Sequence, residues 1–164
     1  MVLLSFEDLY AGKICAALDR QHPRDLYDVY WLLQNEGIDE RLKNAFLVYL
    51  MGHNRPIHEL LAPQAQDIEP LYRAEFEGMI YEPVGLERLQ ETLKQLVREI
   101  HNAMTDEDRH FLLALKQGTQ DWRNFSLPEV ERLPAIQWKM LNLARMNPSK
   151  RRQAAAKLEK ILAK

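Results

Sequence analysis

The sequence of 164 residues has little of several features that define particular classes of protein. Its single cysteine, Cys15, has no partner for an internal disulfide bond, which favours the reducing environment of the cytoplasm. No apolar run approaches the ~20 residues that a membrane-spanning helix needs. The apolar start Met1–Leu4 is also far shorter than the core of a signal peptide. These absences predict a cytoplasmic protein with no membrane partner.

The few glycines and histidines of the chain exclude several kinds of site. Six glycines are present and none forms a Gly-Gly or Gly-Ser pair. The sequence therefore has neither a glycine-rich phosphate loop nor a Gly-x-Ser-x-Gly nucleophile elbow. The histidines show no four-residue spacing and no cysteine partners, so we predict no zinc site among His53, His58, His101 and His110.

Two other groups of reactive residues have simple structural explanations. Asp106 and Asp108 have the two-carboxylate spacing found in metal sites. They follow Thr105 at the expected start of a helix, however, where acids are favoured by the helix dipole. Cys15 is surrounded by apolar residues and has no neighbouring base, which predicts an unreactive thiol. We therefore predict no metal ligands in this chain.

The residues that are present predict an all-α protein. With 46% hydrophobic and 28% charged residues and a net charge of −2, the chain has the composition of a folded domain. We expect one mostly helical domain over 1–164, built as a multi-helix bundle that opens with a helical hairpin, with sub-lobes 1–80 and 86–164. Only Val2–Leu4 has the pattern of a strand, and we interpret residues 1–5 as the remnant of a missing sheet. Apolar periodicity and capping residues place helices at about 5–20, 24–35, 39–51, 56–62, 67–78, 86–104 and 106–117, with two more beginning at Pro134 and Pro148.

Charged residues lie unusually close to the apolar face of the first hairpin. Lys13 falls within the apolar stripe of the first helix, and a lysine facing a core must reach water, lose its charge or pair with a carboxylate. Asp25 and Asp28 lie beside the apolar face of the second helix, across a tight turn at Pro23. The pattern predicts an ion pair between Lys13 and one of these two aspartates. The stripe on the first helix consists of Phe6, Leu9, Tyr10 and Ala17.

Two interpretations of this hairpin remain open at this point. In the structural one, Asp25 caps the second helix and a buried ion pair fixes the turn. In the functional one, Lys13 binds phosphate and is oriented by carboxylates, one of which can accept a proton from an attacking hydroxyl. Buried ion pairs are poor stabilisers, which weakly favours the functional interpretation.

The C-terminal segment is strongly basic. From Lys139 to Lys164 there are eight basic residues and one acidic residue, so the rest of the chain carries a net charge of about −9. This segment is either a solvated helix or a surface that contacts phosphate. In the second case Arg151, Arg152 and Lys157 are the candidates for nucleic-acid contact.

The hairpin sequence also resembles a known family. The stretch FEDLYAGKICAALDR at 6–20, followed by PRDLYD at 23–28, resembles the third motif of the AbiEii-type nucleotidyltransferase toxins of abortive infection and type IV toxin–antitoxin systems. That motif is a lysine, a spacer of about a dozen residues and then Asp-x-x-Asp. The stretch LPAIQWKMLNL at 133–143 is similar to the C-terminal region of the same family.

The resemblance implies a role for each charged residue of the motif. Lys13 would bind nucleotide phosphate, and Arg24 would assist it. Asp25 and Asp28 would be the catalytic or lysine-orienting carboxylates. A complete member of the family would use Mg²⁺ and a nucleoside triphosphate, and a cognate antitoxin would be encoded in the same operon.

The sequence departs from the family in one large respect. The glycine-rich motif and the metal-binding Asp-x-Asp pair, which precede the lysine motif in the family, are not found before it here. We therefore expect a C-terminal helical half that is inactive alone and that self-associates through surfaces left bare by the missing half. The alternative is a helical interaction module whose basic C-terminal helix binds nucleic acid or an acidic partner.

Overall fold

The computed structural model describes residues 4–79, 82 and 84–163 of the chain. Within these residues it contains nine α-helices, two short 3-10 helices and no strand, which confirms the predicted mostly α-helical fold. The predicted strand Val2–Leu4 lies outside the described residues except for Leu4, which is exposed. The helices are α1 (Phe6–Arg20), α2 (Pro23–Asn35), α3 (Glu40–Gly52), α4 (Ile57–Leu61), α5 (Glu69–Glu75), α6 (Leu86–Ala103), α7 (Asp106–Gln117), η1 (Trp122–Asn124), η2 (Val130–Arg132), α8 (Pro134–Arg145) and α9 (Pro148–Leu162).

Local side-chain caps explain where the helices begin. The Ser5 hydroxyl accepts a hydrogen bond of 3.1 Å from the Asp8 amide and so satisfies a backbone donor at the start of α1. Pro23 occupies the first turn of α2. Backbone N–H groups there have no acceptor within the helix, so the missing N–H of proline costs no helical hydrogen bond. Thr105 and Asp108 form a reciprocal capping box at the start of α7. Thr105 therefore caps the helix and the acids at 106–108 lie in its first turn, as the sequence predicts.

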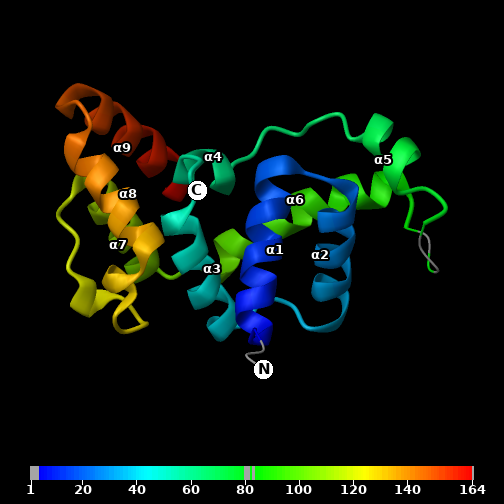
Figure 1. Cartoon of the computed structure of the whole chain (residues 1–164), viewed down its shortest axis with the longest axis horizontal. Helices are drawn as coiled ribbons and strands as arrows, with labels where there is room; N and C mark the ends of the chain where they lie inside the picture. The colour runs from blue at the N-terminus through cyan, green and yellow to red at the C-terminus, as the bar shows by residue number, and fades with distance from the viewer. Residues whose placement is uncertain (1–3, 80–81, 83, 164) are drawn as a thin grey trace.

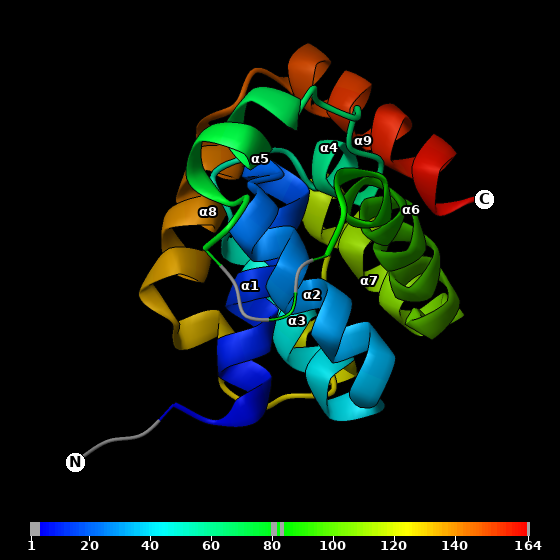
Figure 2. The ribbon, with the colours of Figure 1, turned by 90° about the vertical axis from the view of Figure 1, so that its right-hand side faces the viewer.

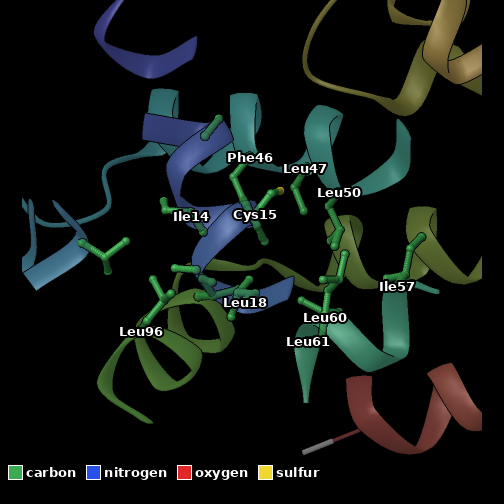
Figure 3. Packing of buried hydrophobic residues seen from close by; sticks show 14 of the residues in the cluster. Ile14, Cys15, Leu18, Phe46, Leu47, Leu50, Ile57, Leu60, Leu61 and Leu96 are labelled. Carbon is green, nitrogen blue, oxygen red and sulfur yellow. The ribbon is translucent and has the colours of Figure 1, made fainter. Parts of the chain in front are cut away.

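The core is formed chiefly where α1 packs against α3. Figure 3 shows side chains of these two helices meeting those of α4 and α6 in one cluster. Each fully buried aliphatic side chain contributes about 1.5–3 kcal/mol to folding relative to an exposed one. The labelled members of the cluster are Ile14, Cys15, Leu18, Phe46, Leu47, Leu50, Ile57, Leu60, Leu61 and Leu96.

The predicted core face of α1 is partly wrong. Phe6 and Leu9 are 45% and 44% exposed, whereas the buried side of the helix runs through Ala11, Ile14 and Leu18. Helix α1 is apolar on two sides, and the side with Ala11, Ile14 and Leu18 is the one that the rest of the core covers. The start of the predicted stripe, at Phe6 and Leu9, is therefore half-exposed, whereas Ala17 at its other end is fully buried as predicted.

The helices are arranged along an extended body. In Figure 1, α5 lies at one end, α7, α8 and α9 lie at the other, and α1 and α3 lie between them. Figure 2 shows α2 and α6 close together, and these helices are in contact. Helix α3 also packs on α8, and α4 packs on α9. Elements of the two predicted sub-lobes thus contact each other, and the division into 1–80 and 86–164 stays a prediction.

Among the described helices, none has both the length and the apolar character that a membrane span requires.

Candidate functional site

An ion pair between Lys13 and Asp28 joins the two helices of the hairpin. Lys13 lies in the middle of α1, Asp28 lies in the second turn of α2, and the ammonium donates a hydrogen bond to Asp28 Oδ2. The two side chains are 31% and 37% exposed, so an anion in solution can reach the ammonium. The predicted pairing of Lys13 with an aspartate is confirmed, and the partner is Asp28.

The second aspartate pairs with a different cation. Arg20 at the end of α1 donates two hydrogen bonds to Asp25, at 2.6 Å to Oδ2 and 2.9 Å to Oδ1. This hydrogen bonding, together with the negative charge of Asp25, raises the pKa of Arg20 above its usual value. The Asp25 side chain is 10% exposed, whereas that of Arg20 is 66% exposed. Asp25 therefore holds an exposed guanidinium in place across the hairpin turn.

The two ion pairs follow one line along the seam of the hairpin. Lys13 and Arg20 are seven residues apart, which places them on the same side of α1 and about 10 Å apart along its axis. Asp25 and Asp28 are three residues apart and share one side of α2. Two partly exposed cations at this separation can contact two different groups of one polyanionic ligand.

Arg24 does not join this row. Its guanidinium donates to the Glu75 carbonyl at 3.3 Å and approaches the Met79 sulfur at 3.6 Å. These contacts direct the side chain toward the end of α5, away from the Lys13–Asp28 pair. The phosphate-binding role that the resemblance gives to Arg24 has no support from the geometry and stays a prediction.

The described residues contain no cluster of three or more carboxylate, histidine or cysteine side chains that could hold a metal ion. Both aspartates of the hairpin are paired with cations, which compete with any metal for the same oxygen atoms. The residues of this hairpin therefore do not fit a Mg²⁺ site by themselves.

Sequence analysis missed a second lysine–aspartate pair. Lys43 on α3 donates a hydrogen bond of 2.8 Å to Asp108 at the start of α7, and both side chains are almost fully buried. A signal for this pair was present, because Lys43 interrupts the apolar pattern formed by Leu42, Phe46 and Leu47. Its partner could not be found from spacing, since the two residues are 65 positions apart.

The single cysteine has no role in this site. Cys15 is 3% exposed and lies between α1 and α3. Burial, and to a smaller extent the charge of Asp19, raise the pKa of its thiol to about 12. The thiol is therefore protonated at neutral pH and is a poor nucleophile, as the sequence predicts.

The basic residues at the C-terminus have different surroundings. Arg151 donates a hydrogen bond of 3.0 Å to the Lys116 carbonyl, and this bond satisfies a backbone acceptor at the end of α7. Arg152 and Lys157 are exposed on α9. Arg151 thus has a structural role, and contact of all three residues with nucleic acid stays a prediction.

The fold and the hairpin define the class of this molecule as a mostly helical protein whose first two helices are joined by two ion pairs. The chain belongs to the AbiEii family, because the family model described as nucleotidyl transferase AbiEii toxin, type IV TA system, matches residues 1–142. A type IV toxin–antitoxin family implies an antitoxin partner. No curated protein and no solved structure matches the chain.

Proposed function

We propose that this chain supplies the nucleotide-binding helical part of an AbiEii-type nucleotidyltransferase, with Lys13 as the phosphate ligand. The observation that carries the proposal is the Lys13–Asp28 pair at the surface of the hairpin. Its position in the sequence is that of the lysine and Asp-x-x-Asp motif in which the hairpin resembles the family. The ammonium is held in place by a carboxylate but remains accessible, as a phosphate-binding lysine must be.

The geometry gives the two aspartates different roles in this proposal. Asp28 contacts Lys13 directly and is 37% exposed, so it is the carboxylate that can orient the lysine and accept a proton near the ligand. Asp25 is bonded through both oxygens to Arg20 and is largely covered. We therefore assign Asp25 as the residue that positions Arg20 beside the phosphate site.

Transfer of a nucleotide would need groups that the described residues do not bring together. A complete member of the family is expected to hold Mg²⁺ and a nucleoside triphosphate, and the metal would neutralise charge on the phosphates. The hairpin aspartates do not fit such a metal site, so its ligands must come from elsewhere. We propose that the 164 residues bind nucleotide but do not transfer it by themselves.

A bare apolar surface near Lys13 is consistent with a missing partner. Leu4, Phe6 and Leu9 are 69%, 45% and 44% exposed, and Leu9 lies one helical turn before Lys13. Exposed apolar side chains close together usually mark a surface that another element covers. We propose that the catalytic part of a complete enzyme, or a second copy of this chain, packs on this stripe.

Nucleotide binding tests the role of Lys13. Titration of the protein with ATP in a calorimeter at low salt should show binding that weakens about tenfold or more in Lys13→Ala, because a charged hydrogen bond is lost. Asp28→Asn should retain most of the binding, since the ammonium remains in place. Lys94→Ala is the matched control, because Lys94 also pairs with an acid, Glu91, at 3.1 Å on an exposed surface. Equal binding by Lys13→Ala and the wild type would refute the assignment of Lys13.

A further inference from the structure

A polar cavity lies between α4 and α9, beside the C-terminal end of α1, and none of the four ion-pairing residues of the hairpin lines it. Figures 1 and 2 both show these two helices side by side near the C-terminal end of the chain, and they are in contact. The cavity has a volume of about 600 Å³, which lies within the usual range for sites that bind small molecules. Its lining includes Gln21, His58, Ala62, Pro63, Lys157 and Ile161.

One wall of the cavity is fixed by a strained residue. Gln21 has a φ of +51°, in the left-handed region that residues with a side chain rarely adopt, and it is 2% exposed. The side-chain Nε2 of Gln21 donates a hydrogen bond of 2.8 Å to the Gln64 backbone carbonyl, and its Oε1 accepts one of 2.9 Å from the Gln66 backbone N–H. These two bonds hold the segment between α4 and α5 against the end of α1. Strained residues of this kind are concentrated at sites where a binding surface is held ready.

The carboxylate of Glu59, which lines the cavity, is already paired with Arg55. Arg55 donates to Asp19 Oδ1 at 2.8 Å and to Glu59 Oε2 at 3.2 Å. Lys157, which also lines the cavity, has no carboxylate within ion-pair distance among the residues that the structure describes. An ammonium without a partner beside a cavity attracts an anion.

His58 adds a neutral hydrogen-bonding group next to this ammonium. Burial lowers the pKa of His58, Lys157 and Lys116 lower it further, and Glu59 opposes them. Its Nε2 is 4.0 Å from Glu59 Oε1, which is too long for a hydrogen bond. The imidazole can therefore donate a hydrogen bond to an incoming oxygen atom while carrying no charge of its own.

We propose that this cavity binds the phosphate group of a nucleotide-sized small molecule. Lys157 pairs with the phosphate and His58 donates a hydrogen bond to it. The apolar side chains of Ala62, Pro63 and Ile161 contact the organic part of the ligand. This site uses none of the charged residues of the hairpin, and the inference does not depend on the proposed role of Lys13.

Calorimetric titration with adenosine 5′-monophosphate tests this inference. Adenosine alone and inorganic phosphate alone, the two parts of this nucleotide, are titrated separately for comparison. The whole nucleotide should bind more tightly than either half. Lys157→Ala should weaken its binding by about tenfold or more through loss of a charged hydrogen bond. The matched control is Lys160→Ala on the same helix, because Lys160 is also exposed but does not line the cavity, and this variant should bind like the wild type. Ala62→Trp, which fills the cavity without changing its charge, should abolish binding.

Lys13→Ala separates this inference from the proposed function. Binding that survives in Lys13→Ala and is lost in Lys157→Ala places the nucleotide in the cavity. Binding that is lost only in Lys13→Ala overturns the inference and leaves the proposed function standing. No binding of the nucleotide by the wild type, or equal losses in Lys157→Ala and Lys160→Ala, would also overturn it. All these positions except Lys13 are exposed on the surface, and circular dichroism of each variant verifies its fold.

Discussion

The two lysine–aspartate pairs of this protein make the same bond in opposite surroundings. Lys13–Asp28 joins α1 to α2 at the surface, with side chains that are 31% and 37% exposed. Lys43–Asp108 joins α3 to α7 in the interior, where the corresponding values are 7% and 10%. Water screens the first pair strongly and the second hardly at all.

This difference separates a pair that can serve a ligand from one that holds the fold. An anion can approach Lys13 without any movement of the helices. An anion could reach Lys43 only if α3 and α7 moved apart, and Asp108 would then lose its counter-charge. The two pairs have the same chemistry, so the residue types alone do not distinguish a ligand-binding role from a structural one. The difference in burial does distinguish these two roles.

Removing the buried lysine should have the largest effect. Lys43→Ala leaves the Asp108 carboxylate buried without its counter-charge, and we expect the free energy of unfolding to fall by about 3–5 kcal/mol. Lys13→Ala removes a half-exposed pair, and its cost should be about 1 kcal/mol or less. Urea denaturation followed by circular dichroism measures both values.

A second variant keeps this comparison interpretable if Lys43→Ala fails to fold. Asp108→Asn retains an oxygen that can accept the Thr105 amide, so the cap is preserved while the charge is removed. It should still destabilise the protein more than Asp28→Asn does. Equal losses at the buried and the exposed aspartate would show that burial does not distinguish the two pairs.

The two sides of α1 allow the same comparison with apolar residues. Leu18 is fully buried against the core, and Leu18→Ala should cost about 2–5 kcal/mol through lost contacts and a new cavity. Leu9 is 44% exposed on the stripe beside Lys13, and Leu9→Ala should change stability by about 0.5 kcal/mol or less. Thermal or urea unfolding of both variants measures the difference.

Leu9→Ala also has a second use. If the stripe of Leu4, Phe6 and Leu9 mediates self-association, this variant should lower the mass measured by light scattering while its stability is unchanged. A large loss of stability in Leu9→Ala would instead show that Leu9 belongs to the core, as the periodicity of the sequence predicts.

The same contrast explains what could be predicted from the sequence. Helix starts were predictable because Ser5, Thr105 and Pro134 act on their own neighbours along the chain. The pair of Lys13 with an aspartate was predictable because a short turn brings α1 and α2 together. The buried face of α1 was not, since α1 is apolar on two sides and the choice between them depends on α3. The Lys43–Asp108 pair depends on a contact between distant segments, and so do the bonds from Gln21 to the segment between α4 and α5. Periodicity within one helix does not reveal such contacts.

A third lysine extends the comparison to a cation that is paired with carbonyl groups. Lys139 on α8 donates to the His53 carbonyl at 2.6 Å, at the end of α3. Burial, and next the charge of Lys116, lower the pKa of Lys139 from 10.5 to about 8. Partial burial without a carboxylate partner therefore makes the charged form of Lys139 less favourable in the folded chain than in the unfolded one.

This cost predicts a small rise in stability with pH. Between a pH of about 8 and 10.5 the unfolded chain binds a proton at Lys139 that the folded chain has lost, so the free energy of unfolding increases with pH. Between pH ~7.5 and ~9 the increase should be about 1 kcal/mol, and Lys139→Met should remove it. Above pH ~9, Cys15 lowers the free energy of unfolding as the pH rises, because its thiol ionises in the unfolded chain but not in the folded one. The rise due to Lys139 is therefore measured up to pH ~9. The same rise in Lys139→Met as in the wild type would show that the ammonium at α8 is well solvated, and that burial distinguishes Lys43 alone among these three lysines.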